Sequence, residues 1–227
     1  MNYLPLILLL LAVILGPQWW VRRVLGRYNQ RPEENFPGTA SELARHLLNQ
    51  SGLQHVRVEV TEKGDHYDPL ERSVRLTPDK FNAKTLTAIT VAAHEVGHAL
   101  QHHTGEPMFA WRNRLVIAAI WGQRIGSFLL FASPLLIILT RTPSLGVISF
   151  IGAFLLMGMG ILVQLVTIPV EMDASFNKAL PILKNGYLEE SQYAAATQIL
   201  RAAAWTYVAA SLAGLLNFWR WMQVLRR

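Results

Sequence analysis

The chain has 227 residues, of which 52% are apolar and only 16% are charged, a composition that is unusual for a soluble protein. Lysine and arginine outnumber aspartate and glutamate by 21 to 15, but the basic residues lie beside apolar segments, which indicates membrane flanks rather than a nucleic-acid surface. The absence of cysteine excludes disulfides and thiolate metal sites.

The first apolar segment, Tyr3 to Trp20, predicts a membrane anchor over residues 1–21. It carries no charge, ends in two tryptophans and is followed by Arg22 and Arg23. A cleaved signal peptide is the alternative, but no basic residue precedes the segment and no small-x-small cleavage site follows it. The arginines after the anchor place the next domain in the cytoplasm by the positive-inside rule, although two C-terminal arginines oppose this if both chain ends lie outside.

Residues 22–114 form a polar region with both helix and strand patterns. Thr39 and Glu42 match a capping box, and the apolar residues that follow predict a short amphipathic helix ending at Gly52. Residues 56–60 and 74–76 alternate between apolar and polar side chains, which predicts two short strands. Residues 22–114 are therefore expected to fold as an α+β catalytic domain, called the head below.

The segment 87–101 predicts one helix that carries the decisive motif. His94 and His98 are four residues apart, so their imidazoles lie on one helix face and can bind one tetrahedral zinc. Glu95 completes the pattern His-Glu-x-x-His, in which the carboxylate is the general base toward a water at the metal. Two unrelated histidines are the alternative, but the neighbours are small and aliphatic, and Gly97 indicates close approach by another element.

Three apolar segments follow. The uncharged stretch 142–170 is long enough to cross a bilayer, and 125–140 reaches across if the preceding residues contribute, so 115–170 predicts a transmembrane hairpin. The weaker segment 202–219 either spans the membrane or packs in the bundle. About four transmembrane helices are expected, and residues 171–227 would hold a ligand-bearing helix followed by a C-terminal membrane helix.

A catalytic zinc commonly takes a third protein ligand and keeps one position for water. His102 and His103 lie near the motif, but they are a further turn along a straight helix, and the metzincin pattern requires histidine where Thr104 stands. Glu171, directly after the long apolar stretch, is the stronger candidate, against the alternative of a membrane-edge carboxylate without a role.

Three segments carry a family resemblance: residues 65–69, 92–101 and 169–175. Together they resemble the bacterial membrane neutral zinc metallopeptidases, from about residue 20 to the end of the chain. The order of motif helix, membrane hairpin and downstream glutamate is more distantly similar to HtpX-type membrane proteases and CAAX prenyl endopeptidases. The resemblance implies a gluzincin-like head in which Glu171 is the third zinc ligand.

One departure from the distant relatives leaves undecided which residue orients the zinc-bound histidine. Their ligand glutamate is followed four residues later by an aspartate that orients a zinc-bound histidine, whereas here that position is Ser175 and the aspartate is Asp173. Either residue is a candidate for this role. His66 and Tyr67 are candidates for the cleft lining, and both, with Tyr207, are candidate oxyanion donors.

These features predict a zinc-dependent endopeptidase, with one Zn²⁺ per chain, in the bacterial inner membrane. Its substrate is a polypeptide, which strand 73–76 would bind as an exposed sheet edge, and the bilayer is its other partner. A catalytically inactive zinc-binding chaperone or scaffold of the same fold is the alternative, and a small transporter is a further rival. Glu95 argues against the catalytically inactive protein, because zinc binding alone does not require that carboxylate.

Overall fold

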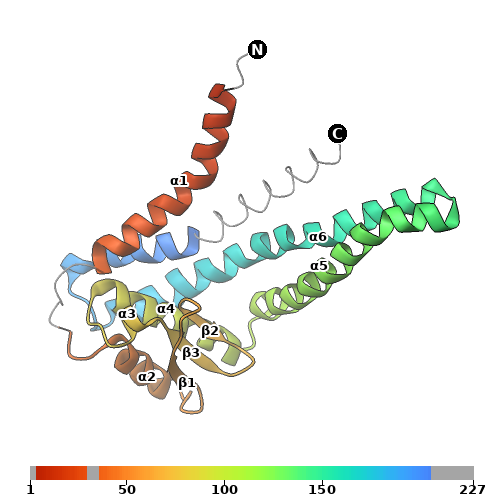
Figure 1. Cartoon of the computed structure of the whole chain (residues 1–227). Coiled ribbons are helices and arrows are strands. Elements are labelled where there is room, and N and C mark those ends of the chain that lie inside the picture. Colours follow the sequence, from red (N-terminus) through yellow and green to blue (C-terminus); the bar gives the residue numbers. More distant parts are fainter. Residues whose placement is uncertain (1–3, 30–35, 206–227) are drawn as a thin grey trace.

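The computed structural model describes residues 4–29 and 36–205, and it is mainly helical with a small three-stranded sheet (Figure 1). Most of the predicted C-terminal apolar helix, 202–219, lies outside the described residues, and so does Tyr207. The expected combination of a mainly helical chain with a small sheet is therefore present in the described part.

Helix α1 (Leu4–Asn29) covers the predicted anchor and continues eight residues beyond its expected end at residue 21. The additional turns pack on the head, since Val21 and Val24 are buried in the core. Two hydrogen bonds to the start of the motif helix fix this contact: Thr87 Oγ1 donates to the carbonyl of Leu25 (3.2 Å), and Thr85 Oγ1 donates to Asn29 Oδ1 (2.9 Å). Helix α1 is thus joined directly to the helix that carries the motif.

Helix α2 (Ala40–Gln50) begins with the predicted capping box. The backbone N–H of Glu42 donates to Thr39 Oγ1, and the Glu42 carboxylate accepts from the backbone N–H of Thr39 (2.8 Å). After the helix, Gly52 has a φ of 73°, a left-handed conformation that favours glycine, so the predicted stop is confirmed.

The sheet contains β1 (Arg57–Val60), β2 (His66–Asp68) and β3 (Ser73–Leu76) in the order β1-β3-β2. β3 pairs in parallel with β1 and antiparallel with β2. The prediction that strand 73–76 is a free edge is wrong, because the three-residue strand β2 lies within the expected loop and covers it. The edges are β1 and β2.

Helix α4 (Leu86–His103) forms the centre of the head, and α3 (Pro78–Phe81) is a short turn before it. All its residues from Leu86 to Ala99 are buried, with α2 and the sheet packed against it. Thr85 caps its start by accepting from the Ala88 N–H (3.2 Å), and Gly105, with a φ of 67°, follows its end. Polar side chains in a helix buried to this degree are costly unless they find partners.

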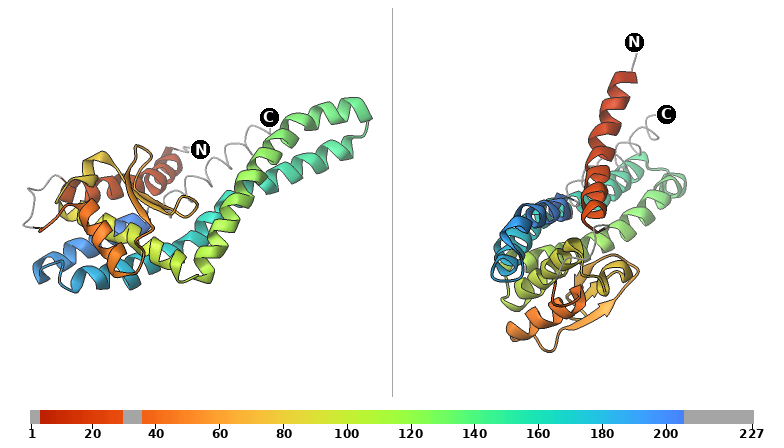
Figure 2. Two further views of the ribbon diagram at one scale, coloured as in Figure 1. Left: turned by 90° about the horizontal axis from the view of Figure 1, so that it is seen from below. Right: turned by 90° about the vertical axis from the view of Figure 1, so that its left-hand side faces the viewer.

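Helices α5 (Pro107–Thr140) and α6 (Pro143–Met172) lie side by side and project from the head (Figures 1 and 2). Within the described residues, two helical stretches are long and apolar enough to cross a membrane. One is α5 itself, and the other runs from Pro143 to Lys184 and begins with α6. Helix α6 continues through the π-helical η1 (Asp173–Ala179) into α7 (Leu180–Lys184), followed by η2 (Glu190–Gln192) and a helix over residues 193–205. The junction of α6 and η1 lies against α4.

Candidate metal centre

Two histidines of α4 and one glutamate of α6 lie together in the buried interior. His94 Nε2 is 3.2 Å from Glu171 Oε2, and His98 Nε2 is 3.3 Å from the same oxygen. One potential ligand atom from each residue lies within 4.8 Å of the other two, and this is the group of three that can hold a metal ion among the described residues. All three side chains are buried, and Glu171 is fully so.

A backbone crossing brings the two helices close enough for this cluster. A Cβ atom at Gly97 would lie 2.8 Å from the carbonyl oxygen of Ala174 in η1, a distance that real Cβ atoms do not show. The expected close approach at Gly97 is therefore confirmed. The π-helical turn begins two residues after Glu171, and such turns occur frequently at functional sites.

The outer nitrogen of each imidazole has its own partner. His94 Nδ1 lies 3.1 Å from Ser175 Oγ, and His98 Nδ1 lies 2.9 Å from Gln101 Oε1. Both rings are consequently held with Nε2 toward Glu171. Ser175 thus contacts His94 at the position where the distant relatives have aspartate.

Gln101 fixes the proton position on His98. Its Nε2 donates to the carbonyl of Val170 (2.9 Å) and to Asp173 Oδ2 (2.8 Å), so its Oε1 is the atom that faces the ring and can only accept. His98 Nδ1 must therefore be the donor, and in the neutral ring the lone pair is on Nε2. Asp173 acts on the histidine through this amide, and Lys178 in turn binds Asp173 (2.7 Å) and Glu106.

The residues fit a metal cation. A neutral His98 would direct a lone pair at a carboxylate oxygen 3.3 Å away, which is unfavourable unless a cation lies between them. The second carboxylate oxygen, Glu171 Oε1, is buried without a hydrogen-bond partner. A buried carboxylate oxygen without a partner is costly, whereas two imidazole nitrogens and a carboxylate oxygen form a common zinc ligand set.

Glu95 is buried beside the cluster, next to the edge strand β2. Burial raises its pKa to about 7, although the charge of His94 and a hydrogen bond from the backbone N–H of Tyr67 act in the opposite direction. A carboxylate with a pKa near neutrality can accept and return a proton at physiological pH. Helix α4 contacts β2, so this edge strand lies beside the helix that carries Glu95.

The other predicted residues are more distant from the cluster. Tyr67 packs against Phe109, whose ring lies 6.2 Å from that of His98, and its hydroxyl is 2.9 Å from His102 Nδ1. His66 points to the opposite face of the strand, and its Nδ1 is 2.8 Å from the carbonyl oxygen of Gly64. Sequence reasoning missed the roles of Gln101 and Phe109. For Gln101, its position three residues after His98 was a usable signal. Phe109 had no such signal.

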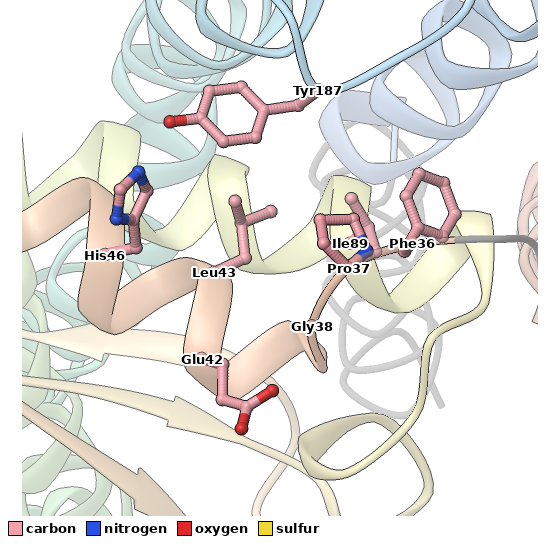
Figure 3. A pocket seen from close by; sticks show the side chains of 8 residues that line it. All are labelled: Phe36, Pro37, Gly38, Glu42, Leu43, His46, Ile89 and Tyr187. Atoms are coloured by element: carbon pink, nitrogen blue, oxygen red, sulfur yellow. The ribbon is translucent and has the colours of Figure 1, made fainter.

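A separate cavity of about 380 Å³ lies between α2, α4 and the loop after α7 (Figure 3). Tyr187 lies across it from Leu43, and Ile89 contributes the α4 wall. The Glu42 carboxylate at its border already binds the Thr39 N–H. None of the cluster residues lines this cavity, so it is separate from the metal centre.

Comparison with known proteins gives a consistent picture. A family model described as "Putative neutral zinc metallopeptidase" matches residues 3–226. The Bacillus subtilis protein named "Putative membrane protease YugP" is 32% identical over 224 residues, which cover 96% of each chain. No solved structure matches the chain. The resemblance to the membrane neutral zinc metallopeptidases is thereby confirmed.

Proposed function

The chain belongs to the neutral zinc metallopeptidase family, and on this basis we propose that it is a membrane-embedded endopeptidase that holds one zinc ion through His94, His98 and Glu171. The observation that carries the proposal is the buried group of three ligand atoms in which both histidine Nδ1 atoms already have partners. This arrangement leaves only the Nε2 atoms and the carboxylate for the metal.

The protein residues supply the proton transfers and the orientation. When bound, zinc would polarise the peptide carbonyl and lower the pKa of a coordinated water toward 7. Glu95 accepts the proton of the attacking water and then donates it to the leaving amine. Its burial beside the cluster excludes bulk water from this exchange.

We place the substrate along β2. This strand has a free edge in the described sheet, and it packs against α4, the helix that carries Glu95. An extended peptide that adds to this edge would be held by main-chain hydrogen bonds with a carbonyl near the cluster. This replaces the sequence-based assignment of that role to residues 73–76.

The membrane arrangement is part of the proposal. The head would be gluzincin-like, and α1, α5, α6 and the C-terminal apolar segment would supply four transmembrane helices in the bacterial inner membrane. Arg22, Arg23 and Arg27 lie on the part of α1 nearest the head, and by the positive-inside rule they support an active site on the cytoplasmic side. An inactive zinc-binding scaffold of the same fold is the alternative, and the buried Glu95 argues against this alternative.

The direct test measures zinc and cleavage together. Protein purified in detergent should contain about one zinc per chain and should cleave unfolded casein. Removal of zinc with a chelator should abolish cleavage, and added zinc should restore it. Stoichiometric zinc without cleavage would support the inactive scaffold, and absence of zinc would contradict the metal centre.

A first prediction concerns the orientation of His98 by Gln101. Gln101→Leu should weaken zinc binding by about 10- to 100-fold, because the donor on Nδ1 loses its acceptor and the ring is no longer held. The measurement is competition for zinc with a chromophoric chelator. Asp173→Asn should have a smaller effect, since asparagine keeps an acceptor for the Gln101 amide.

The control for this prediction is the same chemical change elsewhere. Gln54→Leu alters an exposed glutamine that bonds the carbonyl of Asn49, outside the cluster. It should leave zinc affinity unchanged. Equal affinities in the Gln101 and Gln54 variants would show that Gln101 does not orient the ligand.

A further inference from the structure

A small pocket of about 150 Å³ lies at the end of α4, apart from the cavity of Figure 3. Its lining comes from the chain that enters β1, from β2 with the turn after it, and from the last turns of α4. The side chains that can bind a polar ligand there are His55, Tyr67, Arg72, His102 and His103. The volume exceeds the roughly 10–15 Å³ that one water needs, so a small group such as a carboxylate fits.

The charged and polar lining of this pocket favours an anion. Arg72 carries a permanent positive charge, and no aspartate or glutamate is among the described residues that line the pocket. Arg57 and Arg75 nearby each bind a carboxylate, whereas the exposed guanidinium of Arg72 has no hydrogen bond or ion pair within the described chain. The end of α4 adds a partial negative charge of about one half, which the full charge of Arg72 outweighs. A guanidinium without a partner can bind a carboxylate through two parallel hydrogen bonds.

The backbone holds Arg72 at the pocket in an uncommon conformation. Its φ is 50°, in the left-handed region that residues other than glycine rarely adopt. The carbonyl of Arg72 accepts from the N–H of Arg57 (3.0 Å), and Ser73 begins β3, so the ends of two strands fix this turn. Glycine or asparagine would adopt this conformation at a lower cost. A large cationic side chain kept in such a conformation is typical of a functional position.

His102 supplies a second donor. Its Nδ1 lies 2.9 Å from the Tyr67 hydroxyl, and the two rings meet edge to face with their centres 5.8 Å apart. Burial, together with the nearby charge of Arg72, lowers the pKa of His102, so the ring is neutral at physiological pH. When the Tyr67 hydroxyl donates to Nδ1, the one proton of the neutral ring lies on Nε2 and is available to an anion.

The pocket lies on the face of α4 that carries the proposed general base. Glu95, Ala99 and His102 follow at intervals of four and three residues, and the last two line the pocket. Along the helix axis, Ala99 is about 6 Å and His102 about 10 Å from Glu95. An extended peptide rises about 3.3 Å per residue, so a side chain in the pocket belongs to a residue about two or three positions from the bond attacked beside Glu95. Tyr67 connects the pocket to β2, the strand proposed to bind the substrate.

We propose that this pocket binds an acidic side chain of the polypeptide substrate, about two or three residues from the scissile bond, through Arg72 and His102. Arg72 pairs with the carboxylate, and His102 donates a hydrogen bond to it. The inference rests on the proposed peptidase function and specifies its substrate class: segments with aspartate or glutamate near the cleaved bond. A C-terminal carboxylate has the same chemistry, but an endopeptidase acts within a chain, so the side chain is the expected source.

The test uses peptides with both ends blocked, based on a casein segment that the wild type cleaves. Glutamate or glutamine is placed at the second or third position on either side of the cleaved bond. The wild type should cleave the glutamate form with a kcat/KM about tenfold higher than the glutamine form at one of these positions. Arg72→Asn should bring this ratio near one and leave cleavage of the glutamine form unchanged, since asparagine tolerates a positive φ.

Two outcomes of these rate measurements would overturn the proposal. One is equal cleavage of the glutamate and glutamine forms by the wild type. The other is a preference that appears only when the C terminus is free, which would assign the pocket to a terminal carboxylate. The matched control is Arg141→Asn, the same change at the second arginine with a positive φ (53°), in the loop between α5 and α6. It should keep the tenfold preference, and an equal loss in both variants would also contradict a role of Arg72.

A second readout does not depend on catalysis. In the Glu95→Gln background, binding of fluorescent forms of the same peptides is measured by anisotropy. The glutamate form should bind about tenfold more tightly than the glutamine form, and high salt should reduce the difference. The addition of Arg72→Asn should remove the difference, and a difference that persists would overturn the proposal. If the wild type cleaves no peptide, the proposed function fails, while the binding measurements still report on the pocket.

Discussion

Glu95→Gln is expected to lower cleavage of casein by about 10³-fold, within the range that removal of a general base produces. Glutamine keeps the size and most of the packing of the buried side chain, but it cannot accept the proton of the attacking water. Glu95 is not one of the three grouped ligand atoms, so zinc content should stay at the wild-type value. Metal analysis and cleavage rate, measured on the same preparation, check both statements.

The control for this substitution is Glu62→Gln, which makes the same change at an exposed position between β1 and β2. It should retain wild-type cleavage. Full activity in the Glu95 variant would remove Glu95 from the mechanism, even if zinc is bound. Loss of both zinc and activity would instead make Glu95 part of the metal site, contrary to the proposed division of roles.

The local elements of the head were predictable because their signals are local. Thr39 and Glu42 specify a helix start within four residues, and Gly52 specifies its end through backbone conformation. The motif helix was predictable for the same reason. Gly97 even carried tertiary information, since glycine inside a buried helix implies contact with another backbone.

The long-range arrangement of the strands and of the side-chain partners was harder to predict from the sequence. Strand β2 has three residues, too few for an alternation pattern, and its position decides that β3 is central. Gln101 gains its role only because Val170 and Asp173, about 70 residues away, lie within hydrogen-bond distance of its amide. Partners separated by that distance in sequence leave no periodic signal in a single chain.

The second large effect is expected for Glu171→Gln. It exchanges a charged ligand for a neutral amide at the point where both His Nε2 atoms converge. Zinc binding should weaken more than the roughly 10- to 100-fold produced by loss of an outer partner, and cleavage should be lost with the metal. Zinc at 1,000 times its Kd stabilises a protein by about 4 kcal/mol, so wild type should show a zinc-dependent rise in Tm that the variant lacks.

The metal-free proteins should keep the same order. Without zinc, Glu171 Oε2 lies 3.2 Å from His94 Nε2 and 3.3 Å from His98 Nε2, so a proton on either ring forms a buried ion pair that the glutamine variant loses. Metal-free Glu171→Gln should therefore unfold at a Tm below that of metal-free wild type. Glu106→Gln, which alters a carboxylate bound to Lys178 rather than to the cluster, should keep the zinc-dependent rise. A variant with wild-type zinc affinity would mean that Glu171 supports the fold and that the third ligand lies elsewhere.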